Sequence, residues 1–214
     1  MDARTKEAIR YLGYGGHPID ERTWSMIQDS IQELERIADL KYTYGIFGII
    51  REEVSCLRIG NMSIKSRSLA KSLKDCDEAI VFAITLGAET DRRLRKYELL
   101  DMAKAVVFQA SATAFLEEQC KTAVEGIKRE IEQSGLFLRP RFSPGYGDFS
   151  ILHQKEILEM LEAQKRIGLT MTDSFMLAPA KSVTAVIGVS KTNENCHVNG
   201  CEICTKIDCL YRRN

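Results

Sequence analysis

The stretch Ala79-Ile80-Val81-Phe82-Ala83-Ile84-Thr85 is a short, unbroken apolar run that is followed closely by Gly87. A run of this length beside a turn residue is typical of a strand that is buried on both faces. Aromatic and β-branched residues mark three more strands, at residues 42–50, 54–59 and 183–189. The sequence therefore predicts a sheet with a buried strand, and the runs at 42–50 and 54–59 are expected to pair.

Helical spacing appears between these strands. Residues 5–13 predict a short helix that ends at the glycine-rich stretch Gly13-Tyr14-Gly15-Gly16. Asp20 is a predicted N-cap. The helix after it has an apolar face at spacings of three and four, formed by Trp24, Ile27, Ile31 and Leu34. Two further helices are expected over residues 66–73 and from a cap at Ser150 to about Glu162.

A long helix is predicted from about Glu98 to Gln133, with Gly135 just after its end. Its apolar stripe consists of Leu99, Met102, Val106, Ala110, Thr113, Cys120, Val124, Ile127 and Ile131. Glu117 takes the place on the stripe between Thr113 and Cys120, where burying a carboxylate without a partner is unfavourable. Two interpretations remain open. In the first, the helix ends there, breaks near Ser111, or leaves Glu117 at the edge of the stripe. In the second, Glu117 lines a pocket.

The composition argues against nucleic acid and membrane partners. Of the 214 residues, 44% are hydrophobic and 28% are charged, which is ordinary for a globular protein. Thirty basic residues balance thirty acidic ones, so no net field attracts a polyanion. The N-terminus lacks the apolar core of a secretion signal, and no run approaches the roughly 20 apolar residues that span a bilayer. We expect a cytoplasmic protein with a main domain at 1–190 and a cysteine-rich appendage at 191–214.

Four of the seven cysteines crowd into the end of the chain, at Cys196, Cys201, Cys204 and Cys209. This C-x4-C-x2-C-x4-C spacing suits zinc or an iron–sulfur cluster, because four thiolates can surround one tetrahedral centre. His197 is an alternative ligand, and four free thiols on a frayed terminus are the alternative interpretation. The remaining cysteines are expected to be small core residues; they are Cys56, Cys76 and Cys120.

The stretch Arg141-Phe142-Ser143-Pro144-Gly145-Tyr146-Gly147-Asp148 predicts a tight loop. Pro144-Gly145 fits the centre of a type II turn, where glycine supplies the positive φ. Arg141 offers a planar fork that suits a carboxylate, and Tyr146 offers a flat ring with a hydroxyl tip. Taken alone, however, the loop favours an ordinary turn with a surface arginine.

Several stretches together resemble a known family. They are Arg10-Tyr11-Leu12-Gly13-Tyr14, Ala83-Ile84-Thr85-Leu86-Gly87, residues 141–148, Gly168-Leu169-Thr170, Asp173-Ser174-Phe175 and Pro179-Ala180-Lys181-Ser182-Val183. In this order, over about residues 5–190, the chain resembles the activation, or S-adenosylmethionine-binding, domain of cobalamin-dependent methionine synthase. It is most similar to the free-standing single-domain members of that family.

The resemblance implies a fold and a task. The fold is α+β, with a curved antiparallel sheet and long helices. The family's domain docks over the corrinoid with S-adenosylmethionine bound. A flavodoxin-like donor reduces cob(II)alamin, and methyl transfer then restores methylcobalamin. The implied partner is the cobalamin-binding part of methionine synthase or another corrinoid protein. The chemistry belongs largely to the cofactors, so we assign no catalytic residue and expect an accessory component of a methyltransferase.

The resemblance also implies site residues. Arg141 is expected to pair with the carboxylate of S-adenosylmethionine, and Gly145 and Tyr146 belong to the same pocket. Glu117 is the best match for the family's pocket glutamate, which would bind the amino group. The turn Pro179-Ala180-Lys181 would supply backbone contacts.

One departure keeps alternatives open. Where fused family members have adjacent ligand-contacting tyrosines, this chain has Asn195-Cys196. The pocket is then altered, incomplete, or completed by residues of the cysteine-rich appendage at 191–214. The alternatives are an iron–sulfur electron-transfer protein for a corrinoid protein with a vestigial pocket, or a non-catalytic docking module. Between the two metals we favour iron–sulfur, because the proposed chemistry is reductive.

Overall fold

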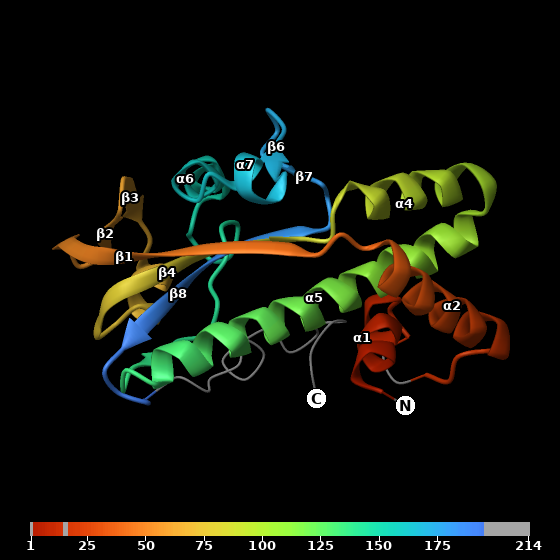
Figure 1. Cartoon of the computed structure of the whole chain (residues 1–214), viewed down its shortest axis with the longest axis horizontal. Helices are drawn as coiled ribbons and strands as arrows, with labels where there is room; N and C mark the ends of the chain where they lie inside the picture. The colour runs from red at the N-terminus through yellow and green to blue at the C-terminus, as the bar shows by residue number, and fades with distance from the viewer. Residues whose placement is uncertain (1, 15–16, 195–214) are drawn as a thin grey trace.

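The computed structural model describes residues 2–14 and 17–194 as an α+β fold built on antiparallel strands (Figure 1). The main sheet has six strands in the order β3-β2-β1-β4-β8-β5. They are β1 (Lys41–Glu53), β2 (Cys56–Ile59), β3 (Met62–Lys65), β4 (Cys76–Thr85), β5 (Phe137–Leu138) and β8 (Ser182–Ser190). A separate two-stranded ribbon consists of β6 (Thr170–Met171) and β7 (Leu177–Ala178).

Strand β4 lies at the centre of the sheet, between β1 and β8. Its side chains alternate between two hydrophobic cores. Ile80, Phe82 and Ile84 pack on the side of the long helix α5, whereas Ala79, Val81 and Ala83 pack on the opposite side. The prediction of a strand at 79–85 that is buried on both faces is therefore confirmed, as is the pairing of β1 with β2.

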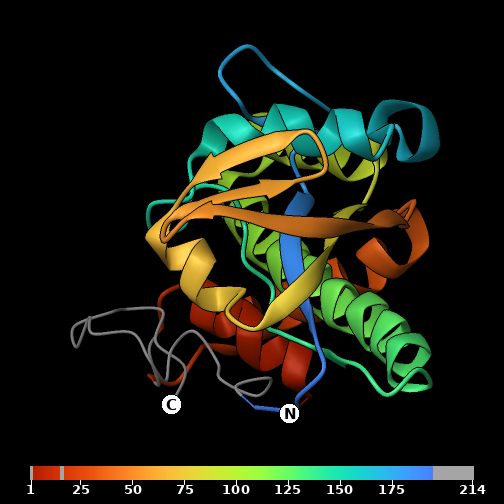
Figure 2. The same ribbon diagram turned by 90° about the vertical axis from the view of Figure 1, so that its left-hand side faces the viewer.

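Helices cover both faces of the sheet. They are α1 (Ala3–Tyr11), α2 (Glu21–Ile37), α3 (Arg67–Ser72), α4 (Ala88–Leu100), α5 (Met102–Glu132), α6 (Gln154–Met160) and α7 (Ala163–Ile167), with a 3₁₀ turn at Ile151–His153. Figure 1 shows α5 crossing one face of the sheet diagonally, with α6 and α7 over the other face. Seen from the end in Figure 2, the β2–β3 hairpin curls away from the strands that α5 covers.

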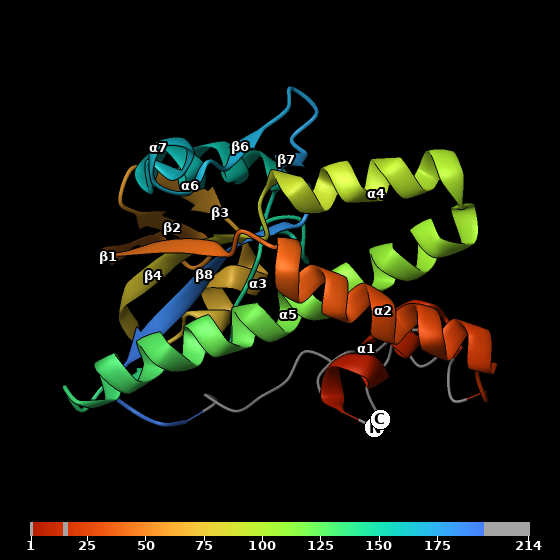
Figure 3. The same cartoon turned by 45° about the vertical axis from the view of Figure 1, so that its right-hand side comes forward.

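The prediction of one helix from Glu98 to Gln133 is wrong at its start. The chain turns sharply at Asp101, which has extended backbone angles and caps α5 by accepting a hydrogen bond from the Lys104 N–H at 3.1 Å. Helices α4 and α5 therefore form a hairpin whose corner is visible in Figure 3. At this corner Leu99 and Met102 are exposed rather than buried. Helix α5 continues without a break through Ser111, which excludes that alternative for the place of Glu117 on the stripe.

Most local signals elsewhere correspond to the structure. Asp20 caps α2 by accepting from Thr23 N–H at 2.9 Å, and Ser66 caps α3. The apolar face of α2 is buried except at Trp24, which keeps 38% of its surface exposed. Strand β3 was not predicted, because it has only four residues and two of them face solvent.

A cluster of ion pairs fixes the N-terminal helix to α5. The Arg4 guanidinium donates to Glu35 of α2 at 2.6 Å and to Glu118 of α5 at 2.5 Å. These contacts attach the start of α1 to α2 and α5, and Tyr11 is the last residue of the same helix. Among the residues that the structure describes, none of the helices combines the length and apolarity needed to cross a bilayer.

Candidate functional site

Glu117 of α5 and Arg141 form an ion pair, with 2.8 Å between Glu117 Oε2 and an Arg141 terminal nitrogen. Their side chains keep 31% and 25% of their surface accessible, so the pair is sheltered but open to a ligand. The buried Cys120 thiol is next to Arg141, and burial raises the pKa of this thiol to about 12. Burial alone would lower the pKa of Arg141, but its interactions with neighbouring side chains, the Glu117 carboxylate among them, more than offset this, so the pKa stays above its usual value. The carboxylate on the apolar stripe therefore has a cationic partner.

The backbone around Arg141 is fixed at both ends of its loop. Phe142 and Val186 exchange two backbone hydrogen bonds, of 2.9 and 2.8 Å, which attach the loop to the edge of β8. At the other end, Asp148 accepts hydrogen bonds from Ser66 Oγ and from the N–H groups of Arg67 and Ser68. These bonds hold the pKa of Asp148 far below its usual range. The loop therefore presents Arg141 from a rigid support.

The turn in this loop has the predicted geometry. Tyr146 N–H donates to Ser143 O at 3.3 Å, and Gly145 has a φ of 90°, as a type II turn requires at that position. Tyr146 keeps 69% of its surface exposed on the rim. The structure thus places Glu117 and Arg141 in contact, and leaves Tyr146 outside that contact and open to a partner.

The backbone of the turn at Pro179-Ala180-Lys181 was expected to contact the ligand, and part of it is hydrogen-bonded within the protein. Ala180 N–H donates to Asp91 Oδ2 of α4 at 2.7 Å, and Lys181 O accepts from Leu86 N–H at 2.9 Å. Two backbone groups of the turn are therefore used within the protein. The Lys181 side chain is instead the feature that faces α5. It is buried, and its Nζ donates to Thr113 Oγ1 at 2.8 Å and to Gln109 O at 3.3 Å.

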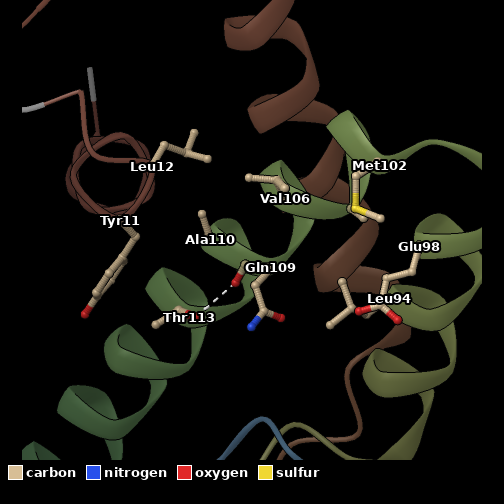
Figure 4. A pocket seen from close by; sticks show the side chains of 10 residues that line it. Tyr11, Leu12, Leu94, Glu98, Met102, Val106, Gln109, Ala110 and Thr113 are labelled. Carbon is tan, nitrogen blue, oxygen red and sulfur yellow. Dashed lines mark hydrogen bonds between the residues drawn. The ribbon is translucent and has the colours of Figure 1, made fainter.

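A cavity of about 480 Å³ opens between α1, α4 and α5 (Figure 4). Its lining includes Gln109 and Thr113, the two residues that Lys181 Nζ contacts, but not Lys181 itself. Its lining is mostly apolar, with a few polar groups, as in sites for small molecules. The lining residues are Tyr11, Leu12, Leu94, Glu98, Met102, Ala105, Val106, Gln109, Ala110 and Thr113. Figure 4 shows the Tyr11 ring on one side and Glu98 and Leu94 on the other, with α5 between them.

The ion pair lies about one helical turn beyond the cavity on α5, and we call the face of α5 that runs from the cavity to Glu117 the groove. Gln109, Thr113 and Glu117 are spaced by four residues, so they follow one face of the helix at steps of about 6 Å. Tyr11 lies near both parts, because it lines the cavity and its pKa is raised by burial and by the nearby negative charge of Glu117. Sequence reasoning did not assign Tyr11 or Gln109 to the site. The only signal was the position of Tyr11 within the stretch Arg10–Tyr14.

No group of three or more His, Cys, Asp or Glu side chains is arranged for metal binding within residues 2–14 and 17–194. The predicted ligands Cys196, Cys201, Cys204 and Cys209 lie outside the described residues, so that site stays a prediction. Of the cysteines expected in the core, Cys76 and Cys120 are fully buried, whereas Cys56 is half-buried on β2.

A comparison with protein families decides the assignment. The sequence model described as "Vitamin B12 dependent methionine synthase, activation domain" matches residues 67–203. The chain belongs to this family. The match includes Glu117, Arg141 and Lys181, but it begins after Tyr11 and the rest of α1.

A solved structure of an activation domain has the same fold. The MetH reactivation domain bound to AdoHcy superposes with a TM-score of 0.61 and 18% sequence identity. The match covers 78% of this chain and 64% of that one, so this activation domain spans somewhat less than two thirds of its structural neighbour's length. At this identity the likeness establishes the fold alone. No curated protein sequence matches the chain.

Proposed function

We propose that this activation domain binds S-adenosylmethionine in the groove along α5 and supports the reductive remethylation of cob(II)alamin on a corrinoid partner. The observation that carries the proposal is the Glu117–Arg141 pair beside the 480 Å³ cavity. A sheltered carboxylate and guanidinium match the two charges of an α-amino acid, and an apolar cavity next to them suits an attached nucleoside. The structural neighbour was solved with AdoHcy, a ligand of this shape.

The ligand's amino-acid end fits the ion pair. Arg141 would bind the carboxylate through its planar fork, and Glu117 would accept from the ammonium group. In the free protein the two side chains neutralise each other, which keeps both charges in place without leaving either one buried alone. Ligand binding would then replace the Glu117–Arg141 pair with two pairs, one between Arg141 and the ligand carboxylate and one between Glu117 and the ligand ammonium group.

The ligand's adenosine end fits the cavity. Tyr11 offers a ring face for the adenine base, while Glu98 and Gln109 offer acceptors and donors for ribose hydroxyl groups. Apolar side chains from α4 and α5 form the remaining walls of the cavity. The groove therefore contains a complementary group for each part of the ligand.

The proposed partner is the cobalamin-binding part of methionine synthase or another corrinoid protein, with a flavodoxin-like electron donor. The corrinoid supplies the redox and methyl-accepting chemistry, and this domain supplies binding and orientation. Tyr146 in the loop of Arg141 and Leu152 shortly after it in the chain are exposed and offer apolar contacts to this partner. Action as a separate chain stays a prediction from the sequence resemblance.

A second candidate function rests on the cysteine spacing at 196–209. We propose a metal centre there, with iron–sulfur favoured over zinc, that carries an electron to a corrinoid protein. Metal analysis and a visible spectrum test this function. A brown protein bleached by dithionite supports it, whereas a colourless protein with one equivalent of zinc excludes electron transfer and leaves a structural metal.

Calorimetric titration of S-adenosylmethionine into the intact protein tests the main proposal. Arg141→Ala is expected to weaken binding by tenfold or more, because it removes a charge-assisted hydrogen bond worth roughly 1.5–3 kcal/mol. Arg129→Ala, an exposed position near the end of α5, is the matched control and should bind like wild type.

Three results would count against the proposal. Absence of saturable binding, or equal binding by Arg141→Ala and wild type, would refute the ligand assignment. Pull-down of a corrinoid partner that is equally strong with and without S-adenosylmethionine would instead favour a docking module.

A further inference from the structure

Lys181 is a buried cation that contacts two α5 residues of the groove, Gln109 and Thr113. Only 8% of the residue is exposed, and its Nζ donates to two neutral oxygens, Thr113 Oγ1 and Gln109 O. The nearest acidic influence is Asp91, whose Oδ2 accepts from Ala180 N–H rather than from the lysine. A buried ammonium group without a close carboxylate is unfavourable, so its position calls for a role beyond packing.

The lysine lies at the midpoint of the groove. On α5, Gln109 lines the cavity, Glu117 pairs with Arg141, and Thr113 lies between them, about 6 Å from each along the helix axis. Lys181 Nζ is bonded at this middle position. In a ligand with a nucleoside at one end and an amino acid at the other, the sulfur joins the two parts. A ligand bound as proposed would have its sulfur opposite Thr113, the residue that Lys181 Nζ contacts.

We propose that Lys181 sets the charge selectivity of the groove, so that its ammonium group disfavours a sulfonium ligand and favours the uncharged thioether. This inference rests on the proposed binding of S-adenosylmethionine. The Lys181 side chain would then distinguish S-adenosylmethionine from S-adenosylhomocysteine. Like charges that face each other in a water-poor groove repel strongly, whereas a neutral thioether meets no such penalty.

The charges around Lys181 define when it is protonated. Burial lowers the pKa of Lys181 to about 8, and the negative charge of Asp91 on α4 opposes that shift. Glu98 of α4 and Tyr11 of α1 face the same cavity. Glu117 of α5 is neutralised by Arg141. The ammonium group is therefore present below pH 8 and is lost as the pH rises above it.

The selectivity has a consequence for the proposed reaction. If the methyl group passed to the Co(I) centre of a corrinoid partner, cobalt would supply the electron pair of the new Co–C bond and the S–C bonding pair would stay on sulfur. The sulfonium becomes a neutral thioether, so its repulsion with Lys181 disappears. An interaction that penalises the reactant and not the product favours transfer.

Calorimetry with two probes, S-adenosylmethionine and S-adenosylhomocysteine, tests the inference on the intact protein. At pH 7 wild type should prefer the thioether, and Lys181→Met should reduce that preference by roughly tenfold or more, because the like-charge repulsion is removed. Lys121→Met, an exposed lysine on α5, is the control and should keep the wild-type preference.

The pH profile gives a second measurement that does not depend on the methionine variant. Between pH 7 and 9 the wild-type preference should shrink towards that of Lys181→Met, while Lys181→Arg, which stays charged, should keep it. A preference unchanged in Lys181→Met, or parallel profiles for wild type and Lys181→Arg, would overturn the inference while leaving the binding site intact. Failure of wild type to bind either probe would instead refute the proposed function.

Discussion

Two glutamate–arginine pairs on the helical side of this molecule have the same chemistry and different surroundings. Glu33 of α2 accepts from Arg93 at 2.5 Å and from the Tyr97 hydroxyl at 2.5 Å, and only 11% of its side chain is accessible. Glu117 accepts from Arg141 at 2.8 Å, and 31% of its side chain is accessible beside a cavity. The first pair, which we call the closed pair, joins α2 to α4 within the protein. The second, which we call the open pair, is accessible from the groove.

The difference separates a structural pair from a binding pair. Glu33 has its acceptor sites used by two partners, so it has little capacity for a ligand. Glu117 and Arg141 satisfy each other's charge but keep accessible surface for further hydrogen bonds. Since carboxylates and guanidinium groups can take several partners, the open pair is the one suited to an amino-acid ligand.

The largest expected effect is on stability, at the closed pair. Glu33→Gln removes a charge that is buried against Arg93 and Tyr97, so it should lower the free energy of unfolding by about 3 kcal/mol. Denaturant titration measures this loss, and S-adenosylmethionine binding by the folded variant should be unchanged. A stability equal to that of wild type would show that the closed pair is not structural.

The same substitution at the open pair should have the reverse profile. Glu117→Gln should change the unfolding free energy by only about 1 kcal/mol or less, because the pair is partly solvated. Affinity for S-adenosylmethionine should nevertheless fall by about tenfold, since the ammonium group loses its charged acceptor. Loss of stability without loss of affinity would place Glu117 with Glu33 among the structural residues.

The smallest expected effect concerns the support of Arg141. Hydrogen bonds from Ser66 and the α3 backbone depress the pKa of Asp148 in the folded state. Its stabilisation is therefore present above about pH 4, where the unfolded carboxyl is ionised, and is lost as the pH falls through the lower folded pKa. Asp148→Asn should melt slightly below wild type at pH 6, and the difference should narrow as the pH falls from 4 towards 2. Melting curves that stay parallel over this range would contradict the anchoring role.

Much of the fold could be predicted from local patterns. The apolar run at 79–85 and the cap residue Asp20 each specify one element through short-range physics, and each is found where expected. The corner at Asp101 was missed, because the apolar spacing runs on through it and the capping role of one aspartate is easily hidden in a charged segment.

The site was predictable only in part. Glu117 was noticeable as a carboxylate on an apolar stripe, and Arg141 as a guanidinium beside a proline–glycine turn. Their contact is long-range, and so is the cavity that Tyr11 shares with α4 and α5. The role of the Lys181 side chain depends on burial against Thr113, which no sequence spacing reveals.

The most direct test of the open-pair account is a crystal structure of this domain with S-adenosylhomocysteine bound. The account predicts the ligand carboxylate on Arg141, the ammonium group on Glu117 and the adenine in the cavity beside Tyr11. A ligand seated elsewhere, with the Glu117–Arg141 pair unchanged, would contradict it.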